Sequence, residues 1–374
     1  MRFLILASLS GSLTGFRKPL IQALLDNGLE VHAAAPELLA NSKVVNELSA
    51  MGVTCHDVAL SRTGMNPIAD VKAMFALRRL MKEIKPNYFM GYTIKPVIYG
   101  NLAAWLAGVP HRYALITGLG YTFIGGQGVK RKLVSKLAHT LYKKALSKTH
   151  KAFFQNPDDE ALFRELGLLP KGTPSVVVNG SGVPVHEYPN TPAPRHAQPK
   201  FLLIARLLGD KGVREYAAAA QIVKQQYPDV EFGLVGRIDE NPNSISQTEF
   251  NGWMADNVLV AHGQQPDVKP YIADCSVYVL PSYREGMPRT VLEAMSMGRA
   301  IITTDAPGCR ETVIDGVNGF LVPVKDANAL AAAMLRFIEQ PELITEMGKC
   351  SREIAEEKYD VHKVNEQMLK GMKL

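Results

Sequence analysis

Cysteine is scarce in this sequence, and long apolar runs are missing from it. The four cysteines are Cys55, Cys275, Cys309 and Cys350. They lie far apart without a C-x-x-C pair, which favours neither a disulfide framework nor a zinc site. No stretch reaches the roughly 18 consecutive apolar residues of a membrane span, and the nearest one, residues 97–109, lies between two prolines. These absences predict a protein of a reducing cytosol without a transmembrane helix.

The first sixteen residues superficially resemble a secretory signal, because one positive charge precedes an apolar run. They offer no A-x-A cleavage site, however. The alternative is a buried first strand over residues 2–8, followed by a loop rich in Gly, Ser and Thr and by a helix over residues 16–27. We expect the strand.

Charge is distributed unevenly along the 374 residues, whose net charge is +6. Residues 1–190 hold 22 Lys and Arg against 12 Asp and Glu, and the remainder holds 20 against 24. Between Glu83 and Asp158 there are eleven basic residues and no acidic one. A bias of this kind predicts that the first half presents a surface to something anionic.

Apolar runs alternate with amphipathic segments in both halves of the chain. We expect strands over 30–35, 53–58 and 113–116, and again over 200–205, 230–235 and 258–261, with helices over 40–51, 66–84 and 327–339 among them. This alternation predicts parallel, doubly wound sheets, and the length suits two domains at roughly 150 residues each. The predicted domains are 1–182 and 200–355, joined by a proline-rich linker over 183–199. The helical C-terminus, 356–374, is expected to cross back to the first domain.

A basic amphipathic helix is predicted over residues 129–151. Apolar residues recur there every four positions from Val129 to Ala145, and lysines and arginines fill the other positions, among them Lys130, Arg131, Lys132 and Lys136. Such a helix can lie on an anionic membrane surface. It can equally pack its apolar stripe on the sheet. Nucleic acid is not expected as a partner, because no recognition motif accompanies the charge.

Ligands of doubly wound sheets bind beyond the carboxyl ends of the strands, and two loops of the first half occupy such positions. In SLSGSLTGF, residues 8–16, Gly11 and Gly15 leave room for a phosphate and permit unusual φ values. The alternative is a plain turn from strand to helix. The loop TGLGYTFIGGQG, residues 117–128, holds five glycines, a density that indicates a mobile or ligand-shaped loop.

Residues 276–305 read as strand, loop, helix and strand. Glu285 and Glu293 lie eight residues apart in this stretch, with Pro288 between them, where the first turn of a helix tolerates proline. A helix N-terminus favours anions, and the two carboxylates can stand up to roughly 12 Å apart. This spacing matches the reach from a hexose across a diphosphate to a ribose. The loop therefore predicts a nucleotide-sugar site.

Three stretches of the second half match a known family. They are the loop with Glu285 and Glu293, the segment ARLLGDKG with Arg206 and Lys211, and the segment PGCRETVIDGVNGFLV. Together they resemble the retaining family-four glycosyltransferases of the GT-B fold, and the resemblance covers essentially the whole chain. It implies an α/β protein with two Rossmann-like, doubly wound parallel-sheet domains that face each other across a cleft.

Further segments resemble one branch of that family: LSRTGMNP, YALITGLGYTFIGGQG, VGRIDENP and LPSYREGMPRTVLEA. The branch implied transfers N-acetylgalactosamine, or a close HexNAc or hexose, from a UDP-sugar to an undecaprenyl-diphosphate-linked saccharide in bacterial N-glycan, O-antigen or capsule assembly. The resemblance thus implies a cytoplasmic enzyme, peripheral on the inner face of the cytoplasmic membrane. Its first domain would take the acceptor and its second the donor.

The resemblance also implies roles for individual residues. Arg206 and Lys211 would hold the donor diphosphate and neutralise its developing charge, a large catalytic effect. Glu285 would accept hydrogen bonds from the transferred sugar, and Glu293 from the ribose diol. The remaining donor-binding residues implied are Gly11, Gly15, Gly236, Arg237, Gln264, Val268, Gly286, Met287, Pro288 and Thr290. The alternatives are an ordinary surface pair for Arg206 and Lys211, and a first-turn carboxylate complementing the helix dipole for Glu293.

No metal or other cofactor is expected, because the chain has no Asp-x-Asp and the two cations can supply the charge of Mg²⁺. Retention in this family is usually thought to proceed with departure and attack on one face of the sugar, so no side-chain nucleophile is required. Family members often carry a histidine near the donor sugar, where this chain has Thr117 and Gly118. Acceptor contacts are assigned only by loop position, to Arg62, Asn66, Lys95, Thr117 and Tyr121.

Several alternatives to this transfer reaction stay open at this point. The GT-B fold also serves sugar-nucleotide epimerases, and a nucleotide-sugar-binding module without activity is a further possibility. Another donor, such as UDP-GlcNAc, UDP-glucose or a GDP-sugar, would fit the same motifs.

Overall fold

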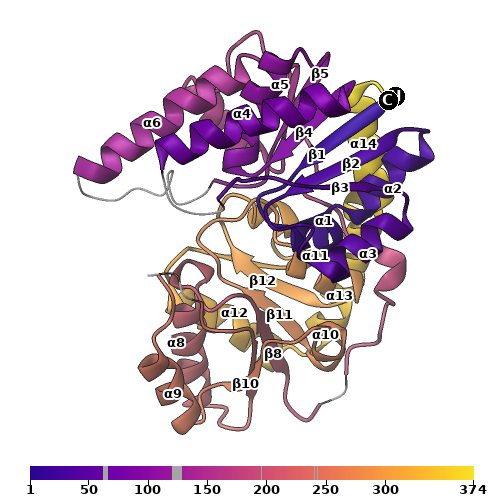
Figure 1. Ribbon diagram of the computed structural model, residues 1–374. Helices are drawn as coiled ribbons and strands as arrows, with labels where there is room; N and C mark the ends of the chain where they lie inside the picture. The colour runs from indigo at the N-terminus through magenta and orange to yellow at the C-terminus, as the bar shows by residue number, and fades with distance from the viewer. Residues whose placement is uncertain (62–65, 120–128, 195, 240, 242) are drawn as a thin grey trace. The chain divides into compact units, whose positions relative to one another are not determined.

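The computed structural model describes residues 1–61, 66–119, 129–194, 196–239, 241 and 243–374, without the side chains of residues 129–134 (Figure 1). The chain forms two compact units. The first consists of Met1–Ser181 together with His362–Leu374, and the second of Gly182–Val361. Of the C-terminal segment 356–374, residues His362–Leu374 are grouped with the first unit.

The first unit is built on a seven-stranded sheet in which every pairing is parallel. Its strands are β1 (Arg2–Leu6), β2 (Glu30–Ala35), β3 (Thr54–Asp57), β4 (Tyr88–Tyr92), β5 (His111–Ile116), β6 (Lys151–Phe154) and β7 (Ser175–Val177). Their order in space is β3-β2-β1-β4-β5-β6-β7. The order reverses between β1 and β4, the position at which doubly wound sheets bind ligands.

Helices cover both faces of this sheet, and alternate residues of β1 show why. Phe3 and Ile5 point into one apolar core and Leu4 and Leu6 into another, as the period-two geometry of a strand requires. The elements are α1 (Gly11–Phe16), α2 (Lys18–Asp26), α3 (Ser42–Ala50), α4 (Pro67–Ile84), the π-helix η1 (Pro96–Gly100), α5 (Asn101–Ala107), α6 (Val129–Leu146), α7 (Pro157–Glu165) and α14 (Val361–Met372).

The second unit contains a six-stranded parallel sheet of order β10-β9-β8-β11-β12-β13. The strands are β8 (Lys200–Ile204), β9 (Glu231–Val235), β10 (Val260–Gly263), β11 (Val277–Leu280), β12 (Ala300–Thr304) and β13 (Gly319–Val322). The helical elements are η2 (Val185–Glu187), η3 (Gly209–Lys211), α8 (Val213–Lys224), α9 (Gln247–Ala255), α10 (Lys269–Asp274), α11 (Arg289–Ser296), η4 (Arg310–Thr312), α12 (Ala327–Glu339), α13 (Glu342–Ile354) and the π-helix η5 (Ala355–Tyr359). Here the strand order reverses between β8 and β11. The predicted α/β class with doubly wound parallel sheets is confirmed.

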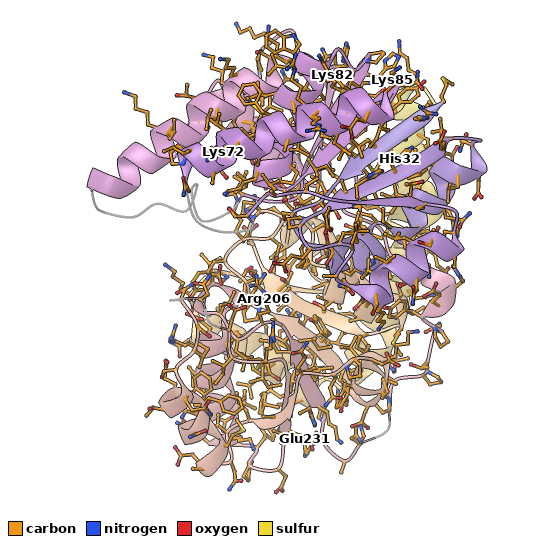
Figure 2. All side chains as sticks on the ribbon, in the orientation of Figure 1. His32, Lys72, Lys82, Lys85, Arg206 and Glu231 are labelled. Atoms are coloured by element: carbon orange, nitrogen blue, oxygen red, sulfur yellow. The ribbon has the colours of Figure 1, made fainter. Side chains whose placement is uncertain are left out.

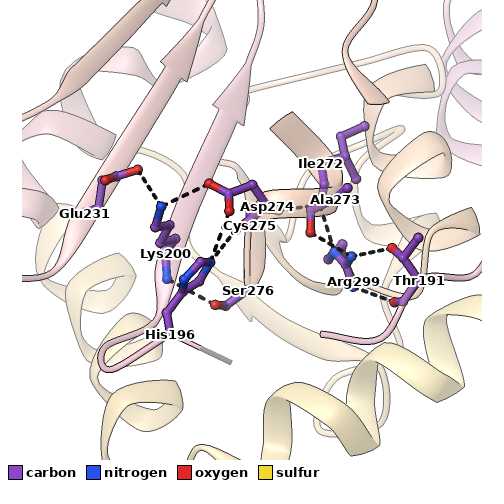
Figure 3. A network of polar contacts seen from close by, with 10 residues as sticks. All are labelled: Thr191, His196, Lys200, Glu231, Ile272, Ala273, Asp274, Cys275, Ser276 and Arg299. Atoms are coloured by element: carbon purple, nitrogen blue, oxygen red, sulfur yellow. Dashed lines mark hydrogen bonds and ion pairs between the residues drawn. The ribbon is translucent and has the colours of Figure 1, made fainter. Parts of the chain in front are cut away.

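Residues 183–194 and 196–199, expected as a linker, belong to the second unit. Thr191 and His196 of this segment form hydrogen bonds to that unit (Figure 3). The fully buried Arg299 explains the packing, because its guanidinium needs acceptors and takes them from backbone carbonyls. It donates to the Thr191 carbonyl at 3.0 Å and to the carbonyl of Ile272 at 2.8 Å. Val183, Val185 and Tyr188 are buried in the same segment. This proline-rich segment, called the strap below, is irregular in structure and is fixed to the second unit.

Two helix predictions required correction. The helix predicted over 129–151 ends at Leu146, and Lys151 opens β6 instead. Ala152, Phe153 and Phe154 are fully buried in β6, between β5 and β7. The burial of these apolar side chains in the sheet therefore ends the helix before the end of the predicted helical pattern. The helix predicted over 16–27 is divided at Arg17, which has a φ of −117°.

No helix within the described residues is long and apolar enough to cross a membrane.

Candidate functional site

The loops that leave β8 and β11 are packed backbone to backbone at the switch point of the second sheet. Gly212 has a φ of +72°, and a Cβ placed on it would overlap the Pro281 carbonyl. The Tyr283 amide donates to the Asp210 carbonyl at 2.9 Å, and the Ser282 hydroxyl donates to the same oxygen at 3.1 Å. These contacts fix the two loops to each other.

Lys211 and Glu285 meet across these loops. The Lys211 Nζ lies 2.5 Å from Glu285 Oε1, and the two side chains are 20% and 14% exposed. The Glu285 amide donates to the Pro307 carbonyl at 2.9 Å, and a Cβ on Gly308 would overlap the Glu285 carbonyl. The pair is held in place from both sides and is still accessible. It places a cation and a hydrogen-bond-accepting carboxylate side by side.

Arg206 points to a different partner. Its guanidinium binds Asp239 at 3.0 Å, and its side chain is 51% exposed (Figure 2 labels Arg206). Asp239 follows β9, where the Leu207 amide donates to the carbonyl of Arg237 at 3.0 Å. The structure thus pairs Lys211 with Glu285 and Arg206 with Asp239, although both cations come from the loop after β8.

Glu293 is a buried carboxylate with two donors on one oxygen. The Tyr188 hydroxyl donates to Oε1 at 2.8 Å and the Arg289 Nε at 3.0 Å, and the residue is 8% exposed. Because α11 begins at Arg289, Glu293 lies in its second turn. The interpretation of Glu293 as a first-turn carboxylate is therefore wrong.

The start of α11 differs in detail from the sequence prediction. Pro288 is the residue that caps the helix and precedes its first turn. Thr290 Oγ1 accepts a hydrogen bond from the Tyr278 hydroxyl at 2.7 Å. Gly286 and Met287 form the approach to the helix, and Met287 packs against the apolar core.

The loops after β9 and β10 complete this edge of the sheet. Gly236 has a φ of +154°, its amide donates to the Gly263 carbonyl at 2.9 Å, and a Cβ on it would overlap the Ala205 carbonyl. Gln264 is exposed. Val268 caps α10 and is partly buried. Gly236 therefore allows the chain after β9 to run close to the ends of β8 and β10.

The nearby Cys309 thiol is buried and is therefore not suited to act as a nucleophile. Burial raises the pKa of Cys309 to about 12, and the charge of Glu285 acts in the same direction. A thiol with this pKa carries almost no thiolate at neutral pH. Within the part of the chain that the structure describes, no three His, Cys, Asp or Glu side chains are grouped to hold a metal ion.

Comparison with known proteins identifies the family. The family model "Glycosyl transferase 4-like" matches residues 4–156, and "Glycosyl transferases group 1" matches residues 198–340. The chain is 30% identical to an N,N'-diacetylbacillosaminyl-diphospho-undecaprenol alpha-1,3-N-acetylgalactosaminyltransferase of Campylobacter jejuni, over 99% of this chain and 98% of that one. The chain belongs to the family-four glycosyltransferases.

Other relatives agree with this assignment. An Escherichia coli UDP-Gal:alpha-D-GlcNAc-diphosphoundecaprenol alpha-1,3-galactosyltransferase is 28% identical over 77% of this chain and 75% of its own. Among solved structures, sucrose-phosphate synthase from Thermosynechococcus elongatus has a TM-score of 0.80 at 19% identity, covering 100% of this chain and 98% of its own. Anabaena HepE in complex with UDP has a TM-score of 0.75 at 17% identity, covering 100% of both chains. The two solved structures show that the fold is shared. The Campylobacter and Escherichia relatives are both transferases, so the epimerase alternative is not supported.

The predicted site residues of the first unit lie in several different elements of this glycosyltransferase. Gly11 and Gly15 both lie in α1 with ordinary φ values, so the conformational freedom of glycine is not used there. Asn66 caps α4 by accepting from the Ala69 amide at 3.1 Å. Lys95 forms an ion pair with Asp70 at 2.7 Å. Thr117 follows β5 and is partly buried.

The remaining predicted residues are those assigned to the acceptor or to the membrane surface. Lys136 is exposed on α6. Arg62 and Tyr121 lie outside the described residues, as do the side chains of Lys130, Arg131 and Lys132.

Sequence reasoning missed Tyr188 and Asp239. Tyr188 lies in the proline-rich strap, 105 residues before the carboxylate that it binds. Asp239 follows a strand in the segment VGRIDENP, and its place after Gly236 and Arg237 was the available signal.

Proposed function

We propose that this glycosyltransferase moves N-acetylgalactosamine, or a close HexNAc or hexose, from a UDP-sugar to an undecaprenyl-diphosphate-linked saccharide, with retention and without a metal. The observation that carries the proposal is the accessible Lys211–Glu285 pair at the switch point of the second sheet. The activities of the Campylobacter and Escherichia relatives, both of which act on diphospho-undecaprenol-linked sugars, support the lipid-linked acceptor.

In this proposal the second unit binds the donor. The Lys211 ammonium neutralises the negative charge that grows on the departing nucleoside diphosphate, and Arg206 leaves Asp239 to bind the same group. Glu285 accepts from a hydroxyl of the transferred sugar. Glu293, buried beside Arg289 and Tyr188, accepts from the ribose diol.

Transfer on one face of the sugar gives the proposed stereochemistry. The bond from the anomeric carbon to the diphosphate breaks, and the acceptor hydroxyl forms the new bond from the same side and passes its proton to the departing phosphate oxygen. No side chain forms a covalent intermediate. The chain has no Asp-x-Asp, and Lys211 and Arg206 supply positive charge where a metal ion would otherwise act.

We place the acceptor and an anionic membrane surface at the first unit, on the face that carries α4 and α6. The side chains of Ile68, Val71 and Phe75, spaced at helical intervals on α4, are 72%, 45% and 52% exposed. Figure 2 labels Lys72, Lys82 and Lys85 in the same region. Exposed apolar residues among lysines are the composition of a helix that lies on anionic lipid.

The decisive experiment incubates the protein with a panel of UDP- and GDP-sugars and a short-chain polyprenyl-diphosphate saccharide, with and without EDTA. We expect UDP release and a product of the same anomeric configuration as the donor, assigned by NMR, in both conditions. Loss of turnover in EDTA would refute metal independence, and inversion of the anomeric centre would refute retention.

A further inference from the structure

Thr93 has a backbone conformation that threonine seldom adopts. Its φ is +69°, and it directly follows β4, one of the two strands at which the order of the first sheet reverses. This conformation is energetically unfavourable for a β-branched residue, and residues held in it cluster at ligand-binding positions. The surrounding structure must therefore hold Thr93 in place.

The hydroxyl of Thr93 connects the chain after β4 to the chain after β1, where the strand order reverses. Its Oγ1 donates to Ser8 Oγ at 2.8 Å, and Ser8 follows β1, the neighbouring strand. Both residues are partly exposed. The pair therefore presents two hydroxyls where parallel sheets receive their ligands.

The chain after Thr93 is closely packed. Lys95 binds Asp70 at 2.7 Å and Ser61 Oγ at 2.8 Å, and the Lys95 and Asp70 side chains are 11% and 5% exposed. The π-helix η1 follows at once, and π-helices are frequent at functional sites. A Cβ on Gly91 would overlap the Pro96 carbonyl, so the turn can form only over a glycine.

Charge at this position decides the class of ligand. The Lys95 ammonium is neutralised by Asp70, so it fastens the loop and does not present a free positive charge. The guanidinium of Arg17 lies over the Tyr92 ring at 5.1 Å, and Arg17 is 3% exposed. Beside these two cations, Thr93 and Ser8 present partly exposed, neutral hydroxyls. They suit the hydroxyls of a sugar better than a diphosphate.

We infer that Thr93 and Ser8 bind a hydroxyl of the terminal sugar of the lipid-linked acceptor. The loop is tied through Lys95 and Asp70 to α4, the helix that exposes Ile68, Val71 and Phe75. It thus connects the sugar-binding hydroxyls to the surface proposed for the lipid carrier. This inference rests on the proposed function, because it names the acceptor contact of the same reaction.

Thr93→Gly tests the inference, because glycine adopts a φ of +69° without strain and removes the hydroxyl. We expect the melting temperature to equal or exceed that of the wild type, while KM for the acceptor rises about tenfold and KM for the donor does not change. Thr93→Ser keeps the hydroxyl, so its KM for the acceptor should stay close to that of the wild type. Ser49→Ala is the control, because it removes an exposed hydroxyl near the end of α3 in the same unit.

Two outcomes would overturn the inference. One is an unchanged acceptor KM in Thr93→Gly, and the other is a rise in the donor KM alone, which would assign the hydroxyls to the donor sugar. Absence of transfer by the wild type would refute the proposed function instead. Saturation-transfer NMR with the acceptor saccharide alone gives a second readout, independent of turnover, in which Thr93→Gly should weaken the signal.

Discussion

Lys211 Nζ lies 2.5 Å from Glu285 Oε1, although the two residues are 74 positions apart in the chain. The proposed role of Lys211 is to stabilise charge on the leaving diphosphate. Lys211→Ala should therefore lower kcat by about 10²–10³-fold, measured as UDP release. The Lys211→Ala/Glu285→Gln double variant should lose less than the product of the single losses, because the two groups act together. A loss in the double variant equal to the product of the two single losses in kcat would contradict this coupling.

Gly308 controls the position of Glu285, because a Cβ there would overlap the Glu285 carbonyl. Gly308→Ala should lower kcat/KM by about 100-fold through displacement of the carboxylate. Gly316→Ala is the control, since Gly316 has a similar φ of +76° against +80° but open space around it. Similar activity losses in both variants would show that backbone strain, and not displacement of Glu285, is responsible.

Membrane binding should depend on the apolar residues of α4. Ile68→Ser and Phe75→Ser each remove an apolar side chain worth about 1.5–3 kcal/mol when fully buried, so each should weaken binding to anionic vesicles about tenfold in sedimentation. Leu166→Ser is the control, because Leu166 is also exposed, at 43%, and lies at the end of α7. Equal binding to neutral and anionic vesicles would remove the electrostatic part of the proposal.

The His32–His56 pair predicts acid sensitivity of the first unit. His32 Nδ1 and His56 Nε2 lie 2.9 Å apart, and burial, with the charge of His32, lowers the pKa of His56 below 6.5. The unfolded chain therefore binds a proton more readily, so stability is retained above pH 6.5 and falls as the pH drops through the folded pKa. His56→Gln should flatten the dependence of the melting temperature between pH 7 and pH 5. An unchanged slope would exclude this pair as its source.

Arg299 should be a main determinant of the stability of the second unit. Its guanidinium is fully buried and donates to backbone carbonyls of residues 191, 272 and 273 (Figure 3). Arg299→Lys keeps the charge but cannot reach all of these acceptors, so unfolding in urea should lose about 3 kcal/mol. Lys349→Ala, at an exposed position, is the control and should change little. Equal midpoints for the two variants would contradict the role of Arg299.

The strands and helices with clear periodicity were predictable from the sequence. Residues 30–35 and 327–339 form β2 and α12 with the predicted bounds. β4 was missed because its five residues, YFMGY, contain a glycine and follow a proline closely. β13 was missed because it follows a turn-rich segment and begins with Gly319.

The site was predictable only in part, for a related reason. Lys211 and Glu285 follow strands and belong to motifs, so the resemblance placed both at the donor. Their proposed roles remain predictions. The partners Asp239 and Tyr188 lie in irregular chain, where no period marks which residues approach one another. Thr93 was missed because a left-handed φ is expected of glycine and asparagine, and a threonine gives no sign of it.

Residues His362–Leu374 complete the first unit, which affects the order in which the two units form during synthesis. Val364, Met368 and Met372 of α14 are buried in the core that also contains Phe3 and Ile5, and the Tyr113 hydroxyl donates to the Met372 carbonyl at 2.8 Å. Chains emerge from the ribosome N-terminus first. The second unit, Gly182–Val361, is therefore fully translated while one face of the first unit still lacks its covering helix. The unit that is made first is therefore completed only after the second, and it exposes apolar surface until α14 has been made.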